Sequence, residues 1–236
     1  MQVFDAFDGA LLVDKPAGPT SHDVVENIRR QFQIKKVGHC GTLDPNATGL
    51  LIILLGRGTK LSEKLMSDDK VYSGTIKFGE TTNSYDVDGE LVASLPVPLI
   101  TLEELNEAAA AYLGDQLQTP PMVSAIKKDG VPLYKLARQG IEVERKPRLI
   151  HIYSFRFGSY EEPLGRFRVA CTKGTYVRSL AHDLGQKLGC GAHLVHLRRA
   201  VSGKFDVADA IEYEEVLQLS EADLLKRVIP FLELAR

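Results

Sequence analysis

The chain has 236 residues and a mass of 26.0 kDa, and 44% of its residues are hydrophobic, so it can bury a sizeable core and is not globally disordered. Its longest strongly apolar run, residues 50–55, is far shorter than the roughly 20 residues that a membrane-spanning helix needs. No basic residue precedes Lys15, which argues against a secretory signal, and three widely spaced cysteines argue against a disulfide framework. We therefore expect a cytoplasmic protein without a membrane segment.

Charge is unevenly distributed along the chain, although the net charge is only −2. Residues 127–204 hold sixteen Lys and Arg against six Asp and Glu, an excess of +10, whereas the two flanking segments together carry −12. A basic block of this size indicates a surface for a polyanion, because Lys and Arg neutralise the phosphates of nucleic acids. The alternative at this point is an ordinary surface of mixed charge, because clustering along the sequence need not become clustering in space.

Hydrophobic patterning predicts an alternation of strands and helices. Residues 10–13 form a short apolar strand, Ser21 caps a helix that runs to Phe32, and the strand at residues 50–55 precedes a short helix near residues 59–66. The remaining expected elements are a strand at 71–78, a turn at 84–90, a helix at about 101–113, strands at 150–157 and 166–171, a helix at 176–188 and a strand at 193–201. This order favours an α+β fold with a mainly antiparallel sheet.

Four chain breakers, three glycines and Pro45, surround a single carboxylate, Asp44, in the segment 37–49. Glycine permits close backbone approaches, and proline restricts the residue that precedes it to an extended conformation. A loop of this kind holds one side chain in a fixed pose, as functional loops often do. Asp44 is therefore our candidate catalytic residue, and the alternative is an aspartate that only stabilises the turn.

Six segments, in order along the chain, resemble motifs of the bacterial tRNA pseudouridine synthase B family, which isomerises uridine 55 in the TΨC arm of tRNA. They lie at residues 15–21, 38–49, 69–72, 118–140, 174–180 and 191–199. The resemblance covers about residues 10–203 and implies the pseudouridine synthase fold, a mainly antiparallel mixed sheet flanked by helices, with an RNA-gripping insertion at about 118–149. Two positions depart from the family pattern, because Asn46 replaces a usually apolar residue and Val123 replaces a frequent tyrosine.

The resemblance also implies how the chain is divided. It makes residues 1–204 the catalytic domain. Residues 205–236 form a short acidic tail, and because this charge disfavours phosphate binding we expect the tail to pack on that domain. Longer members of the family append a complete PUA RNA-binding domain, which we do not expect here.

The resemblance assigns roles to individual residues. It makes Asp44 the catalytic carboxylate, Arg178 the cation that orients it, and Tyr72 the aromatic side chain that stacks on the base and assists loss of the C5 proton. His39 would help to displace the target base, and Leu197 would exclude water from the site. The candidate contacts to RNA phosphates and bases are Lys15, Lys127, Lys128, Tyr134, Arg138, Arg145, Arg148 and Arg199. Taken singly, each of these residues has an ordinary structural explanation.

No cofactor is implied, and we expect tRNA as the partner of a monomeric protein. Cys190, His193 and His196 are spaced three residues apart. On the expected strand His193 and His196 point to opposite faces, so we expect no metal site. Two other functions stay open. A nucleoside hydrolase could also use an aspartate near a ribose, although most glycosidases need a pair of carboxylates, and an RNA chaperone would need only the basic block.

Overall fold

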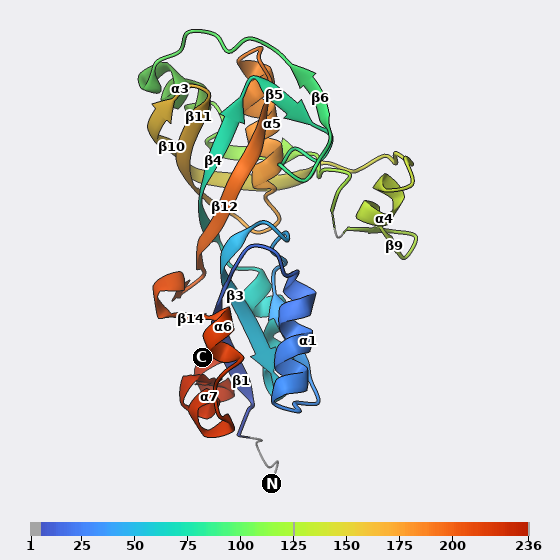
Figure 1. Ribbon diagram of the computed structural model, residues 1–236, viewed down its shortest axis with the longest axis vertical. Coiled ribbons are helices and arrows are strands. Elements are labelled where there is room, and N and C mark those ends of the chain that lie inside the picture. Colours follow the sequence, from blue (N-terminus) through green and yellow to red (C-terminus); the bar gives the residue numbers. More distant parts are fainter. Residues whose placement is uncertain (1–5, 125, 236) are drawn as a thin grey trace. The chain divides into compact units, whose positions relative to one another are not determined.

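The computed structural model describes residues 6–124 and 126–235. They form two compact units (Figure 1). Unit 1 contains the residues up to Tyr72 and those from Leu197 onward, and unit 2 runs from Ser73 to His196. Strands β4 (Lys70–Phe78) and β12 (Ala192–Ser202) therefore each begin in one unit and end in the other.

Unit 1 is built on a mixed sheet. Its strands follow the order β14–β1–β3–β12, and β2, β13 and β15 are added to β3, β12 and β1. The pairs β1–β14 and β3–β12 are parallel, and the others are antiparallel. The strands are β1 (Gly9–Lys15), β2 (Val37–Cys40), β3 (Thr48–Leu55), β13 (Phe205–Asp206), β14 (Ile211–Glu212) and β15 (Ile229–Pro230). The helices are α1 (Ser21–Gln31), α2 (Ser62–Met66), α6 (Tyr213–Val216), α7 (Glu221–Arg227) and α8 (Phe231–Ala235), with short 3₁₀ helices at Gly56–Leu61 and Val207–Asp209.

Strand β3 is a continuous apolar run because both of its faces are buried. The odd-numbered residues from Leu51 to Leu55 join a core cluster with the apolar stripe of α1. The even-numbered residues from Leu50 to Leu54 join a second cluster with Leu65 of α2 and Leu234 of α8. Helices therefore cover both faces of this sheet, which is why β3 lacks the alternation of a half-exposed strand.

The C-terminal segment is part of the core of unit 1. Tyr213, Val216 and Leu224 belong to the same cluster as α1, and β14 and β15 each pair with β1. The acidic residues of this segment are exposed, and its buried side chains are apolar. Residues 205–235 thus complete the sheet and core that the N-terminal segment begins.

Some element boundaries differ from those that the sequence predicts. Thr20, rather than Ser21, is the N-cap of α1, because its hydroxyl accepts from the N–H of Asp23 while the Asp23 carboxylate accepts from the N–H of Thr20. The helix expected near residues 59–66 is a 3₁₀ turn followed by the short helix α2. The helix expected at 101–113 begins as predicted but ends at Ala110.

Unit 2 contains the sheet order β12–β4–β11–β10–β7 and two small separate strand pairs. Its other strands are β5 (Glu80–Thr82), β6 (Leu91–Ser94), β7 (Gly114–Gln118), β8 (Lys127–Lys128), β9 (Val131–Pro132), β10 (Arg148–Glu161) and β11 (Leu164–Cys171). Its helices are α3 (Leu102–Ala110), α4 (Leu133–Ala137) and α5 (Val177–Lys187). The expected α+β class, with a mainly antiparallel mixed sheet and flanking helices, is confirmed. Among the described residues, no helix has the length and apolar character needed to cross a bilayer.

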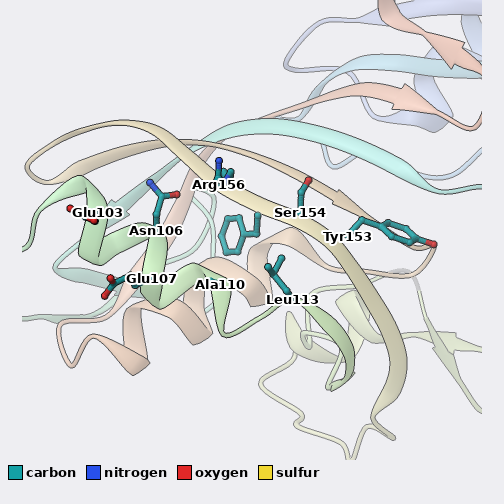
Figure 2. A pocket seen from close by; sticks show the side chains of 9 residues that line it. Glu103, Asn106, Glu107, Ala110, Leu113, Tyr153, Ser154 and Arg156 are labelled. Carbon is teal, nitrogen blue, oxygen red and sulfur yellow. The ribbon is translucent and has the colours of Figure 1, made fainter.

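The long strand β10 outruns its neighbour β7, which pairs only with the segment from Arg148 to Ile152. Beyond that point a side chain takes the place of a strand. The amide of Asn106 in α3 accepts from the N–H of Phe157 (2.8 Å) and donates to its carbonyl (3.1 Å). Figure 2 shows Asn106 beside the pocket that α3 and β10 line together. Asn106 thus provides a hydrogen-bond partner for Phe157, at a point of the strand edge that β7 does not reach.

Replacing Asn106 by Ala should lower the free energy of unfolding by about 1–3 kcal/mol, because two backbone groups of Phe157 lose their partner. The exposed neighbour Glu107 is the matched control, and Glu107→Ala should change the stability by less than about 0.5 kcal/mol. Urea unfolding followed by circular dichroism measures both variants. Equal stabilities would contradict the role of Asn106 as a hydrogen-bond partner of Phe157.

Candidate active site

Asp44 lies in the loop that joins β2 to β3 in unit 1. The two strands pair in antiparallel register, so this loop is the end of a hairpin. A turn closes it, since the N–H of Ala47 donates to the carbonyl of Asp44 (3.0 Å). The side chains of Leu43 and Ala47 are buried in the core cluster, whereas Asp44 is half-buried. The loop is therefore anchored at two apolar residues and presents its carboxylate between them.

The backbone before Asp44 is held by Ser21, the first residue of α1. The Ser21 hydroxyl donates to the carbonyl of Leu43 (3.0 Å) and accepts from the N–H of the same residue (2.9 Å). All of these atoms are buried, so water does not compete for them. This explains why the hydroxyl is not the helix cap that the sequence suggests, and it makes Ser21 a positioning residue that the motif alone did not reveal.

The backbone after Asp44 is held by Lys15, the last residue of β1. Its ammonium donates three hydrogen bonds to backbone carbonyls, those of Pro16 (2.7 Å), Pro19 (2.8 Å) and Pro45 (3.0 Å). An ammonium has three N–H donors, so all of them are used. The side chain thereby ties the proline-rich turn that follows β1 to the residue next to Asp44.

Lys15 has no exposed surface, and this burial lowers the pKa of its amine to about 8. The carboxylate of Asp44 acts in the opposite direction and raises the pKa of Lys15, so the two groups attract each other. A buried ammonium whose donors are all engaged has none left for an RNA phosphate. The structure therefore does not support the expected phosphate contact of Lys15 and gives it a positioning role.

Arg199 is buried in the same way and links the two stems of the Asp44 loop. Its Nε donates to the carbonyl of Leu50 (2.7 Å), and its Nη2 donates to the carbonyl of Gly41 (3.0 Å). The side chain is 2% exposed, so it too lacks the access that an RNA contact requires. On β12 its backbone pairs with Gly49, where a Cβ would lie 2.3 Å from the Arg199 carbonyl oxygen. Only glycine fits this close approach.

His39 lies on β2, half-buried, and its Nδ1 is buried without a hydrogen-bond partner among the described residues. Burial lowers the pKa of the imidazole below its ordinary value, and the charges of Arg199 and His22 lower it further. His39 is therefore neutral near pH 7. A neutral, partly accessible ring beside the Asp44 hairpin suits contact with a base better than contact with a phosphate.

Tyr72 and Leu197 are the two residues at which the chain leaves and re-enters unit 1. Both are half-buried and pack against the core cluster that contains Leu43 and Ala47. Unit 1 thus brings an aromatic and an aliphatic side chain to the same core that anchors the Asp44 loop.

Arg178 belongs to unit 2, at the start of α5, and is 4% exposed. Its guanidinium donates to the carbonyls of Ser84 (3.1 Å) and Val123 (2.8 Å) and forms an ion pair with Asp86 (3.2 Å). The buried carboxylate of Asp86 balances the buried cation, as a charge in such a place requires. The expected contact of Arg178 with Asp44, which lies in unit 1, stays a prediction.

Asp86 is a residue that the sequence interpretation missed, since the segment reads only as a turn. Its carboxylate accepts from the hydroxyl of Ser84 (2.5 Å) and the N–H of Asp88 (3.1 Å), and its carbonyl accepts from the hydroxyl of Thr82 (2.7 Å). Small hydroxyl residues at alternate positions before an aspartate were the available signal, because such side chains bond to nearby backbone in turns. Hydrogen bonds within the turn thus fix Asp86, whose carboxylate forms the ion pair with Arg178.

The predicted RNA-gripping insertion is fastened to the start of α5. Gln118 exchanges two hydrogen bonds with the backbone of Tyr176, accepting at 2.7 Å and donating at 3.1 Å. Further along, the carbonyl of Val123 accepts from Arg178. The family departure at Val123 therefore leaves this contact intact, because a backbone atom makes it.

The candidate RNA contacts in the insertion differ in accessibility. Lys127 and Lys128 are exposed on the small β8–β9 pair, and the exposed guanidinium of Arg138 lies 5.6 Å from the ring centroid of Tyr134. Arg145 is less free, because it donates to the carbonyl of Pro120 (3.2 Å) and pairs with Glu142 (3.0 Å). Arg148, at the start of β10, is exposed. The exposed residues fit RNA contact better than Arg145 does.

In the described part of the chain, neither a metal-binding cluster nor the pocket of Figure 2 includes the predicted site residues. Within residues 6–124 and 126–235, no three His, Cys, Asp or Glu side chains are grouped so that they could hold a metal ion. The imidazole of His193 lies against the backbone carbonyl of Glu80 (3.1 Å). The pocket between α3 and β10 is lined by unit 2 residues such as Glu103 and Tyr153, and none of the predicted site residues lines it (Figure 2).

Two family models together match most of the chain. The model of the TruB family pseudouridylate synthase (N terminal domain) matches residues 29–177, and that of the tRNA pseudouridylate synthase B C-terminal domain matches residues 178–235. The chain is 55% identical to tRNA pseudouridine synthase B of Opitutus terrae over 97% of this chain and 95% of that protein. It is 47% identical to the protein of that name from Syntrophotalea carbinolica over 97% of this chain and 75% of the relative.

A solved structure, the crystal structure of a Cbf5-Nop10-Gar1 complex, contains a chain that is similar to this one with a TM-score of 0.76 and 27% identity. The similarity covers 97% of this chain but 62% of the solved chain, so the protein spans less than two thirds of it. A chain of the archaeal box H/ACA sRNP Nop10-Cbf5 complex shares the fold with a TM-score of 0.72. The expected pseudouridine synthase fold is thereby confirmed. The family models, which match residues 29–235, and the similarity to the Opitutus terrae protein show that the chain belongs to the TruB family of tRNA pseudouridylate synthases.

Proposed function

We propose that the protein isomerises uridine 55 in the TΨC arm of tRNA to pseudouridine, with Asp44 as the catalytic carboxylate. The observation that carries this proposal is the loop around Asp44, whose backbone is hydrogen-bonded on both sides while the carboxylate itself stays half-buried. A reacting group must reach its substrate yet keep its geometry, and this arrangement provides both. Family membership supports the reaction, and the relatives named tRNA pseudouridine synthase B support tRNA as substrate.

The reaction breaks the bond between N1 of uracil and C1′ of ribose and forms a bond between C5 and C1′. The C5 proton is lost and N1 gains a proton from water or a side chain, so substrate and product have the same atomic composition. A carboxylate suits this task because it can assist cleavage of the N1–C1′ bond and is regenerated at the end of the reaction. Asp44 supplies that carboxylate, and its charge interacts with the nearby ammonium of Lys15.

Three residues of unit 1 would surround the flipped base. The ring of Tyr72 offers a face for stacking and a hydroxyl for the departing C5 proton. Leu197 excludes water that would otherwise turn bond cleavage into hydrolysis. The neutral imidazole of His39 helps to displace the base from its stack in the RNA.

Arg178 would act on Asp44 as its orienting cation. Its guanidinium is held by Ser84, Asp86 and Val123, so it is presented in one direction. A guanidinium suits this role better than an ammonium because its planar donors match a carboxylate. Arg178 is thus a positioning residue in this proposal, and Asp44 is the reacting group.

The direct test is incubation with an unmodified tRNA transcript, followed by carbodiimide mapping of pseudouridine. A transcript with cytidine at position 55 is the control and should remain unmodified. Release of free uracil would instead indicate that the protein is a nucleoside hydrolase. Binding of the tRNA without any chemical change would indicate that the protein is an RNA chaperone.

Replacing Asp44 by Asn should lower turnover by about 10³-fold or more, because the variant keeps the shape of the side chain but loses its charge. Affinity for tRNA should remain within a few-fold, because no phosphate contact is removed. Asp209→Asn, at an exposed carboxylate of unit 1, is the matched control and should retain full activity. Normal turnover by folded Asp44→Asn protein would refute the assignment.

Replacing Tyr72 by Phe should slow release of the C5 proton by about 100-fold, because the ring stays but the hydroxyl is removed. Tyr72→Leu should in addition weaken binding of the base, because it removes the stacking face. Tritium release from tRNA labelled at C5 of its uridines measures the step. A Phe variant that releases tritium at the wild-type rate would show that the hydroxyl has no part in it.

The insertion would supply much of the RNA affinity. Its exposed cations, Lys127, Lys128 and Arg138, lie in a segment anchored to α5, so they are presented from a fixed base. Tyr134 lies beneath Arg138 and offers a ring for stacking. These interactions with RNA are electrostatic and should depend strongly on salt.

Neutralising Lys127, Lys128 and Arg138 to Gln should flatten the slope of log affinity against log salt by up to about 0.7–0.9 for each phosphate that the protein no longer neutralises. Replacing Lys35, Lys36 and Arg227, exposed cations of unit 1, changes the charge by the same amount and is the control. Filter binding of tRNA across a salt series measures both slopes. If the control flattened the slope and the insertion variant did not, the RNA contacts would lie outside the insertion.

A further inference from the structure

Tyr85 has an unusual backbone conformation at the centre of the turn that holds Arg178. Its φ is +66°, in the left-handed region that side chains other than glycine, asparagine and aspartate rarely adopt. Such a conformation persists only where its surroundings over-determine it, and it recurs at functional sites. Two neighbouring groups hold it here, since the Tyr85 carbonyl accepts from the N–H of Leu194 (3.0 Å) and the ring contacts α5.

The ring of Tyr85 stacks on the imidazole of His182, with centroids 3.9 Å apart and planes 18° apart. His182 lies four residues after Arg178 on α5, so both side chains emerge from the same face of the helix. The turn is therefore attached to α5 at two points. One is Arg178 with Ser84 and Asp86, and the other is the stacked pair of Tyr85 and His182.

His182 is suited to stacking as a neutral ring. Its Nδ1 is buried and has no hydrogen-bond partner among the described residues, and burial lowers the pKa of the imidazole below its ordinary value. The reaction chemistry described above does not use this ring. Its visible contribution is its flat face, which lies against Tyr85.

We propose that Tyr85 and His182 are positioning residues for the reaction, and that their stacked rings fix the turn at residues 83–89 so that Ser84 and Asp86 keep Arg178 in place. This inference rests on the proposed role of Arg178. The left-handed backbone at Tyr85 directs its ring onto the helix, and the stacked pair keeps the turn from rotating about its backbone contacts. Loss of either ring should leave the turn present but loosely placed.

Two substitutions at Tyr85 separate the ring from the backbone. Tyr85→Gly relieves the left-handed conformation but removes the ring, whereas Tyr85→Phe keeps the ring and removes only the hydroxyl. The glycine variant should lower kcat by about 10–100-fold with little change in KM, since small misplacements of a positioning group carry such costs. The phenylalanine variant should retain wild-type kcat. If the glycine variant were fully active, the ring would have no role.

The partner residue gives an independent pair of variants. His182→Phe preserves a flat ring and should retain activity, whereas His182→Leu keeps an apolar side chain without one and should lower kcat. Gln186→Ala, an exposed position one turn further along α5, is the control and should match the wild type. Thermal unfolding of each variant identifies any that fail to fold. Equal activity of the Phe and Leu variants would overturn the role of stacking.

A double-mutant cycle with Arg178→Lys tests whether Tyr85 acts through Arg178. If it does, Tyr85→Gly should cause little further loss of kcat once Arg178 has been replaced, because the two changes share one pathway. Fully multiplicative losses would show that Tyr85 acts elsewhere and would refute the inference. Wild-type protein that makes no pseudouridine would instead refute the proposed function, so the two failures are distinguishable.

Discussion

Hydrogen bonds to the backbone on both sides of Asp44 are the constraint on which the candidate site depends. A loop between two strands loses much conformational entropy when it is ordered, and buried backbone groups must find partners. Ser21 satisfies both groups of Leu43, and Lys15 satisfies the carbonyl of Pro45. The carboxylate between these residues is thereby held in place without being fully buried. The N-terminal motif and the aspartate loop, which are far apart in the sequence, act as one structural element.

Buried cations perform the same task elsewhere in the molecule. Arg199 binds the carbonyls of Gly41 and Leu50, and Arg178 binds that of Val123 beside its ion pair with Asp86. Burying a charge is costly unless hydrogen bonds or an opposite charge compensate it, so these side chains are tied to one geometry. These buried cations differ from the exposed cations of the insertion. Arg178 and Arg199 hold backbone carbonyls, whereas Lys127, Lys128 and Arg138 are exposed and so remain accessible to a ligand.

The sequence predicted the regular elements well where apolar residues repeat clearly, as in α1, β3 and the arms of the β10–β11 hairpin. It was less accurate where two neighbouring residues compete for one role. Thr20 and Ser21 can each cap a helix. Thr20 is the N-cap, because the hydroxyl of Ser21 is hydrogen-bonded to the backbone of Leu43. Similarly, a lysine in an RNA-binding family suggests a phosphate contact, but the carbonyls around Lys15 use every donor it has.

By itself, the sequence determined the α+β class, the order of the main elements, the family and the candidate catalytic loop, because periodicity and motif spacing are local properties of the chain. Only the tertiary structure decided which polar side chains remain available for chemistry. The partner of Ser21 is Leu43, that of Arg178 is Asp86, and that of Tyr85 is His182. Each pair joins segments far apart in the chain, and such contacts form only when folding brings those segments together.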